Sequence, residues 1–481
     1  MKNFTKLLFG ILALSITLQT NAQELISSEY LTSRSKNQIN NQFGFNPFVL
    51  SGVDMYKITY TTPDIQGVTD TASGLLIVPD DLSKIYPVLS FSHGTVASKQ
   101  NVPSNLQGGW ELAMVMAAHG YVTMAADYLG LGEARGFHPY VHADSEAWAS
   151  VDALFATREF ADQNNVFLND QLFLSGYSQG GHAALATQRL LQEEYADDFT
   201  VTASSPMSGP YDIYGAQTDY TLGDEEFFYP GFLPYVALGY QQAYPDLFTE
   251  IGDFFKPQYV EMIEKFRDGV IDLNNLNIQM IIQLNSEHGA VIPRHCLQDS
   301  ISEAILNNPD HYVSVALADN NLWEDWVPQA PTRFPYCGAD DQVHWSNSTV
   351  AADAFNAAGA PDTQAELIND NFDHGQCVVP ATTFTLLFFR NWQLIEDANN
   401  VTDKNTLPVD IFPNPANDFL NIEGLETEAD LLLYDLTGGV VLNQKLTFGN
   451  NQIKTDNLQI GVYFAEIIAE EGYRMEKIII E

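Results

Sequence analysis

The sequence predicts an α/β protein with a doubly wound, mostly parallel sheet, an inserted helical cap and a small C-terminal β-sandwich. Three observations lead to this fold class. Strand-like runs alternate with helical patterns before residue 207 and after residue 332, an aromatic-rich segment lies between them, and short alternating strands fill the end of the chain. Alternating strands and helices are typical of parallel sheets that carry helices on both faces.

The two alternating regions define the predicted sheet and its helices. Strands are predicted at 55–62, 73–79, 86–92, 121–127, 172–178, 201–206, 333–339 and 365–369, and helices at 145–163, 180–194, 349–358 and 382–397. The runs at 86–92 and 121–127 are almost continuously apolar, as expected for strands that are buried on both faces. Ser145 is the expected N-cap of the first helix.

Residues 211–331 interrupt the sheet pattern and predict the cap. The fifty residues from 211 to 260 contain fourteen aromatic side chains, although aromatic residues make up only 12% of the chain. We expect most of these rings to pack inside the cap and a minority to line the cleft that it covers.

The two ends of the chain differ from the rest in composition. Residues 1–22 have Lys2 and Lys6, an apolar run at 7–18 and small residues up to Ala22, which predicts a cleaved secretory signal peptide. A membrane anchor is the alternative, but a span needs about 20 apolar residues. The main domain is predicted at 23–398, a polar linker at 399–406 and the β-sandwich at 407–481.

Charge and cysteine content exclude several classes of function. The chain has 21 Lys and Arg against 62 Asp and Glu, a formal net charge of −41. Nucleic acid and anionic membrane surfaces are therefore not expected partners, because both require a basic surface. Three cysteines exclude a four-thiolate metal site built by one chain and allow at most one internal disulfide.

Ser178 is the predicted nucleophile. It lies in Gly176-Tyr177-Ser178-Gln179-Gly180, directly after a buried strand and before an Ala- and Leu-rich helix. This is the strand–turn–helix setting that a nucleophile elbow requires, because small neighbours let strand and helix approach each other around a strained serine. A glycine-rich turn with an incidental serine is the alternative.

A serine nucleophile needs a base and an orienting carboxylate, which follow it in the order acid, then histidine. Beyond the elbow helix the chain has His288, His295, His311, His344 and His374. His374 is the predicted base, because its polar loop follows the last predicted strand. Asp340 is the predicted acid at the preceding strand end; Asp341 remains the alternative and is expected to be a solvated turn residue.

Two backbone amides are predicted to form an oxyanion hole. One belongs to Gln179, the residue after the nucleophile. The other is expected in His93-Gly94-Thr95, after the strand at 86–92, with Thr95 as the donor.

Together these motifs resemble the α/β-hydrolase superfamily, and within it the secreted esterases and lipases with an inserted cap. The resemblance covers about residues 54–394 and rests on the segments 92–95, 126–132, 176–181, 336–340 and 373–377. It implies ester hydrolysis through an acyl-enzyme, with Ser178, Asp340 and His374 as a triad and with no metal or organic cofactor. The net charge and the aromatic cap favour small to medium neutral esters.

The tail resembles the C-terminal sorting domain of the type IX secretion system of Bacteroidetes. The segments that carry this resemblance are 412–418, 433–438, 461–464 and 477–480. It implies export across the outer membrane by that machinery, with removal or surface attachment of the tail. The protein is thus expected to be secreted or attached to the cell surface; a carbohydrate-binding β-sandwich is the alternative for the tail.

If the acid and base loops adjoin, Cys337 and Cys377 can form a disulfide that ties them together and leaves Cys296 free. Two other functions are alternatives to the esterase. A peptidase of the prolyl-oligopeptidase type shares the order of the triad but needs an N-terminal propeller, for which residues 23–53 are too few. A non-catalytic surface-binding protein would have no reason to retain Ser178, Asp340 and His374 together.

Overall fold

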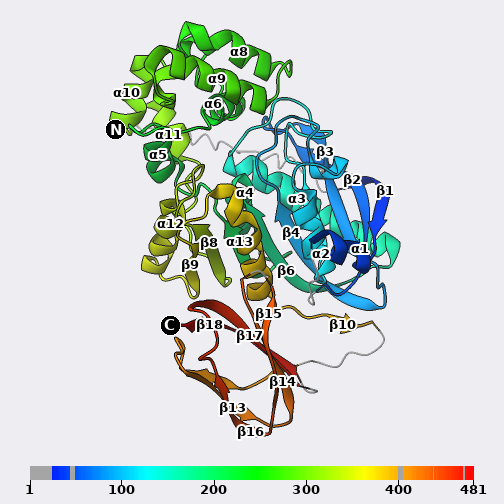
Figure 1. Cartoon of the computed structure of the whole chain (residues 1–481). Coiled ribbons are helices and arrows are strands. Elements are labelled where there is room, and N and C mark those ends of the chain that lie inside the picture. Colours follow the sequence, from blue (N-terminus) through cyan, green and yellow to red (C-terminus); the bar gives the residue numbers. More distant parts are fainter. Residues whose placement is uncertain (1–23, 44–48, 399–404, 437, 470–471) are drawn as a thin grey trace, which may run out of the picture.

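The computed structural model describes residues 24–43, 49–398, 405–436, 438–469 and 472–481. Figure 1 shows three stacked parts: a helical cap, a main domain built on a twisted sheet, and a β-rich tail. We call residues 24–398 without the cap the main domain and residues 405–481 the tail. The predicted signal peptide and most of the predicted linker lie outside the described residues.

The sheet of the main domain is mixed and mostly parallel. Its order is β1-β2-β3-β5-β4-β6-β7-β8-β9; β1 to β3 are antiparallel, β5 runs antiparallel to β3, and β5 and all later neighbours run parallel. The strands are β1 Leu25–Arg34, β2 Val53–Pro63, β3 Thr69–Pro79, β4 Lys84–Ser92, β5 Val122–Ala126, β6 Phe167–Tyr177, β7 Val201–Met207, β8 Thr332–Cys337 and β9 Thr363–Asn369, with the short β10 Glu396–Asp397 beside β4. The predicted fold class is confirmed, and β1 adds an edge strand that was not predicted.

Helices cover both faces of this sheet, as its apolar strands require. One face packs against α1 Lys36–Phe43, α2 Trp110–Ala118 and α13 His374–Phe389. The other packs against α3 Ala143–Asn164, α4 Gln179–Glu194 and α12 Ser346–Ala357.

Helices α3 and α13 differ from the prediction at their ends. His142, not Ser145, caps α3, because its side chain accepts the Ser145 N–H at 3.3 Å. The closing helix was predicted at 382–397, but α13 begins at His374 and ends at Phe389, with Pro380 inside it. A capping box in which Asp373 and Gln376 bond each other's backbone amides starts the helix.

The cap lies between β7 and β8 and is helical, as predicted. Its helices are α5 Thr218–Thr221, α6 Phe232–Ala243, α7 Ile251–Phe254, α8 Pro257–Arg267, α9 Leu273–His288, α10 Asp299–Asn307 and α11 Tyr312–Ala318, with a π-turn at Ile213–Gln217 and a 3-10 turn at Pro293–Cys296. Most of its aromatic rings are buried, among them Tyr235, Tyr240, Phe254, Phe255 and Tyr259.

The tail is formed by two small sheets that share one apolar core. One has the order β11-β18-β17-β14-β15 and the other β12-β13-β16. Their bounds are β11 Asn405–Thr406, β12 Asp410–Phe412, β13 Phe419–Leu425, β14 Ala429–Tyr434, β15 Val440–Leu446, β16 Gly449–Lys454, β17 Gly461–Ala469 and β18 Gly472–Ile480. Because β11 pairs with β18, the tail sheet begins two residues inside the predicted linker. Within the described ranges, no helix is long and apolar enough to cross a bilayer.

Candidate active site

Ser178 occupies a sharp turn between β6 and α4. Its backbone angles are φ 62° and ψ −125°, a region that non-glycine residues rarely adopt and that only surrounding structure can enforce. The Ser178 N–H donates to Met207 O on the neighbouring β7 at 3.0 Å, which fixes the turn to the sheet. The serine is therefore held at the carboxyl edge of the parallel strands.

The glycines beside Ser178 are sterically required. A Cβ atom at Gly176 would lie 2.2 Å from Gly180 O, and one at Gly180 would lie 2.0 Å from Ser92 O. Both contacts are with backbone atoms, which cannot move aside. The sequence motif therefore reflects a close approach of β4, β6 and α4 at this point.

Asp340 and His374 lie together in the structure. The Asp340 side chain is almost fully buried, and its Oδ2 lies 2.7 Å from His374 Nδ1. Asp340 Oδ1 accepts the N–H groups of Gln342 at 3.0 Å and Val343 at 2.9 Å, so the carboxylate is held from both oxygens. The pairing requires Nδ1 to carry a proton, which leaves Nε2 of a neutral His374 as a proton acceptor.

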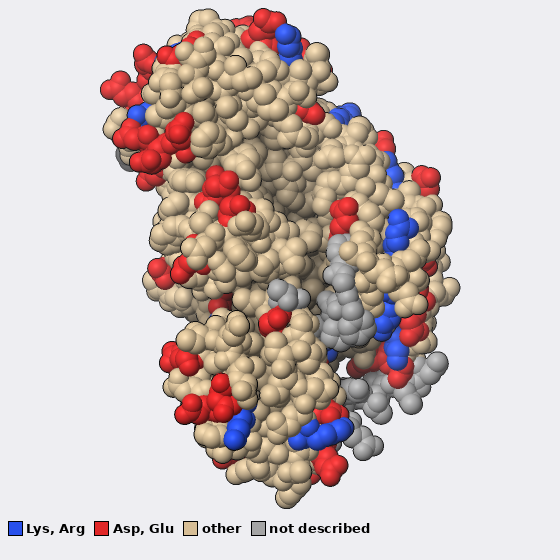
Figure 2. Space-filling view, viewed as in Figure 1, with Lys and Arg blue, Asp and Glu red and all other residues tan. Residues whose placement is uncertain are grey.

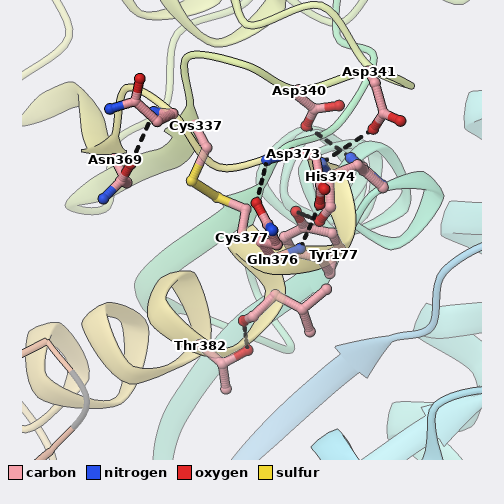
Figure 3. The surroundings of a disulfide bond; sticks show 12 residues. Tyr177, Cys337, Asp340, Asp341, Asn369, Asp373, His374, Gln376, Cys377 and Thr382 are labelled. Atoms are coloured by element: carbon pink, nitrogen blue, oxygen red, sulfur yellow. Dashed lines mark hydrogen bonds and ion pairs between the residues drawn. A yellow bond between two sulfur atoms is a disulfide. The ribbon is translucent and has the colours of Figure 1, made fainter.

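Tyr177 joins the base loop to the elbow. Its hydroxyl donates to His374 O at 2.6 Å, and its ring packs against the imidazole with centroids 4.9 Å apart. Since Tyr177 directly precedes Ser178, these contacts bring the proposed base and the proposed nucleophile to one edge of the sheet. Figure 3 shows Asp340, His374 and Tyr177 gathered at the start of α13.

Asp341 is exposed in the bend after β8, as expected, and it also contacts the start of α13. Its Oδ1 accepts the backbone N–H of His374 at 3.2 Å, although the residue is exposed. This contact was not predicted; it forms because the first N–H groups of a helix have no partner within the helix, and α13 begins at His374. Asp341 thus positions the backbone of His374, while Asp340 contacts its ring.

The disulfide expected from adjoining acid and base loops is present. Cys337 at the end of β8 and Cys377 in the first turn of α13 form it, with Cα atoms 6.0 Å apart. Cys296 is buried in the cap and free, as expected. The bond links the segment that precedes Asp340 to the helix that begins with His374 (Figure 3).

Of the two segments predicted to form the oxyanion hole, one directly follows Ser178 and the other packs against the elbow. Gln179 is the first residue of α4, so its N–H has no acceptor within the helix. Gly94 lies against the elbow, because a Cβ there would be 3.2 Å from Tyr177 O and 3.8 Å from Ser178 Cβ. Thr95 follows it, and its hydroxyl bonds the hydroxyl of Tyr140 at 2.7 Å.

A buried polar network behind Gln179 was missed at the sequence level. Glu146 Oε1 accepts Gln179 Nε2 at 2.7 Å, and Glu146 Oε2 lies 2.8 Å from His182 Nδ1. The other His182 nitrogen lies 3.1 Å from Asn320 O at the end of the cap. Gln179 Nε2 also faces His138 Nε2 at 2.7 Å. Burial lowers the pKa of His138 to about 3, which keeps this ring neutral and able to accept.

An apolar cavity opens from Ser178 and Gln179 into the cap. It has a volume of about 110 Å³. Its walls are mostly aliphatic and aromatic side chains of the cap, including Ile213, Leu222, Phe232, Val236, Tyr240, Phe254, Val313 and Leu317. The expectation that a minority of the cap aromatics line a cleft is therefore confirmed.

The fold and this arrangement define the class of protein: an α/β hydrolase with a helical cap. The chain belongs to the secretory lipase family, whose model matches residues 100–382. A secretion system C-terminal sorting domain matches residues 410–481. The protein is thus a secreted hydrolase of the esterase and lipase type, and its tail marks it for export to the cell surface through the type IX system.

Solved structures agree with this family. The rice cell wall degrading esterase LipA from Xanthomonas oryzae is 27% identical, with a TM-score of 0.67 over 78% of this chain and 99% of that chain. A hydrolase described as putative, from Legionella pneumophila, is 24% identical with a TM-score of 0.69 over 79% of this chain and 100% of that chain. Candida antarctica lipase A shares the fold at 14% identity, with a TM-score of 0.57 over 80% of this chain and 84% of that chain. No curated protein matches the sequence.

Proposed function

We propose that the protein hydrolyses carboxylic esters through an acyl-enzyme formed on Ser178. The observation that carries the proposal is the buried Asp340–His374 pair at 2.7 Å, which Tyr177 ties to the strained turn that presents Ser178. A hydroxyl is a poor nucleophile at neutral pH, and a base whose other nitrogen is held by a carboxylate is what activates it.

In the proposed reaction, His374 Nε2 accepts the Ser178 proton as Oγ bonds to the ester carbonyl carbon. The resulting oxyanion accepts hydrogen bonds from the N–H groups of Gln179 and Thr95. Its collapse breaks the bond to the alcohol oxygen, which takes the proton from His374. Water then attacks the acyl group by the same route, which releases the acid and restores Ser178.

The surroundings of Ser178 favour neutral esters with an apolar acyl part. The cavity beside Ser178 is lined mostly by apolar side chains, which gain free energy when they bury an alkyl or aryl group. The net charge of −41 repels anionic substrates. On the face of the molecule drawn in Figure 2, acidic side chains are spread over the cap, the main domain and the tail.

The test uses the protein from residue 23 onward with aryl esters of increasing acyl length, neutral alkyl esters with a succinyl counterpart, and proline-containing peptide amides. We expect ester turnover that depends on acyl length, is weak on the anionic ester, and is lost in Ser178→Ala. Turnover that survives in Ser178→Ala contradicts the mechanism. Peptide cleavage faster than ester cleavage would favour a peptidase of the prolyl-oligopeptidase type. Residues 25–34 form an edge strand of the main sheet rather than part of the propeller that such a peptidase carries.

A further inference from the structure

The strand β17 of the tail is buried on both of its faces. Along it, Tyr463, Ala465 and Ile467 belong to the core between the two tail sheets, whereas Phe464 packs with residues of the main domain. Successive side chains of a strand point to opposite faces, so one face of this sheet completes the sandwich and the other is turned toward the main domain. A free tail would expose that second face to water.

The second face packs on α13, the helix that begins with His374. Tyr434, Phe464 and Met475 share one buried cluster with Phe384 and Phe388 of α13. The rings of Phe464 and Phe384 meet edge to face, with centroids 5.8 Å apart. In Figure 1 the C-terminal end of α13 points into this sheet.

A buried carboxylate specifies how the two parts fit. Glu466 is 2% exposed, in the middle of an otherwise apolar stretch of β17. Its Oε1 accepts the guanidinium of Arg390 at the end of α13, and its Oε2 accepts the Tyr434 hydroxyl at 2.7 Å. A buried carboxylate is tolerated only when it is paired and hydrogen-bonded, and here the positive partner comes from the main domain.

Two further side chains of the tail, Tyr473 and Lys477, make polar contacts with the main domain. The Tyr473 hydroxyl lies 2.8 Å from Gln393 O and 2.5 Å from Arg390 O, the backbone that follows α13. Lys477 Nζ lies 2.5 Å from a carboxylate oxygen of Glu366 on β9. Because these contacts are directional, they fix the orientation of the tail as well as its contact with the main domain.

We propose that the tail sheet face formed by Tyr434, Phe464, Glu466, Tyr473 and Met475 is a docking surface for α13 of the same chain. The full-length protein is then presented for export as one packed unit. Docking covers this face, so the export machinery has to read the surfaces that stay free, such as the β12-β13-β16 sheet. The covalent connection gives the tail an effective concentration of about 1 mM, so a micromolar dissociation constant keeps nearly all chains docked.

The test cuts the connection in the folded protein. A recognition sequence for a specific protease is placed within residues 399–404 of the chain from residue 23 onward, and the purified protein is cleaved under native conditions. Sedimentation equilibrium over a dilution series then measures the dissociation constant of the two pieces. We expect pieces that stay together at micromolar concentration; pieces that fail to associate up to about 1 mM overturn the proposal.

Matched variants assign the contact to this surface. Glu466→Gln removes the buried charge and keeps the shape, and we expect it to weaken association about 10- to 100-fold, as for loss of a hydrogen bond to a charged group. Asp430→Asn is the control, since Asp430 pairs with Lys445 within the tail and is half-exposed. If Glu466→Gln does not fold, Arg390→Gln tests the same pair from the main domain. A dissociation constant unchanged by the loss of either partner overturns the assignment.

Discussion

The Asp340→Asn variant gives the sharpest test of the proposed catalytic machinery. In the protein, Asp340 Oδ1 accepts two backbone N–H groups and Oδ2 faces His374 Nδ1. The asparagine oxygen has to take the place of Oδ1, because an amide NH₂ cannot accept. The NH₂ group then faces Nδ1 and donates to it, which moves the single proton of a neutral imidazole to Nε2.

An imidazole protonated at Nε2 cannot accept the Ser178 proton. We therefore expect kcat to fall about 10⁴-fold, which corresponds to about 5 kcal/mol of transition-state stabilisation, with little change in KM. The fold of the loop persists because both backbone donors keep an acceptor. Initial rates on an aryl ester near neutral pH measure the effect.

Asp341→Asn is the matched control, because the contacts of Asp341 are with the backbone N–H of His374 through Oδ1 and with the Tyr229 hydroxyl through Oδ2, not with the imidazole. An asparagine oxygen can replace Oδ1. We expect a loss of less than about 10-fold there, since only a partly exposed hydrogen bond changes. A rate for Asp340→Asn within about 10-fold of the parent protein would refute the assignment of Asp340 as the orienting acid.

Three further predictions concern stability. Replacing Cys337 and Cys377 by serine opens a loop with a sequence separation of 40 residues, and loop-closure entropy predicts a loss of about 4 kcal/mol in the free energy of unfolding by urea. Glu146→Gln leaves a buried histidine without its carboxylate and is expected to cost about 3 kcal/mol in the same assay; an unchanged urea midpoint contradicts this. Burial lowers the pKa of His119 to about 4 and of His138 to about 3. Below about pH 6.5 these two histidines therefore bind more protons in the unfolded chain than in the folded protein. As the pH is lowered from 6.5 to 4, each of them reduces the free energy of unfolding by up to about 1.4 kcal/mol per pH unit. A urea midpoint that stays constant over this range would argue against neutral buried rings.

The sequence was sufficient for those parts of the site that depend on local chemistry and chain order. The strained turn at Ser178 needs glycines on both sides, so its motif lies within a short stretch of sequence and can be recognised there. Asp340 and His374 could be chosen because the ends of parallel strands meet at one edge of the sheet, whatever lies between them in the chain. The structure then puts His374 Nδ1 2.7 Å from Asp340.

The contacts that were missed join residues that are distant in sequence and of ordinary type. Glu146 and His182 are 36 residues apart, and nothing in either helix signals that the two side chains meet in the interior. The start of α13 was missed for a local reason, because Gly375 and Pro380 both disfavour helix. The capping box at Asp373 and the disulfide at Cys377 stabilise the helix more than Gly375 and Pro380 destabilise it. Of these two features, only the disulfide depends on tertiary structure.

Helix α13 makes stabilising contacts at both ends, with the main domain at its start and with the tail at its end. At its start, Asp340, Asp341 and the Cys377 disulfide hold His374 from the β8 side. At its end, Arg390 engages Glu466 of the tail. Among the described residues, the contacts that fix the His374 ring and backbone come from the main domain. We therefore expect loss of the tail to expose Phe384 and Phe388 without moving the base. Removal of the sorting tail is therefore compatible with an intact active site. We expect the protein without its tail to be less stable but to keep its kcat.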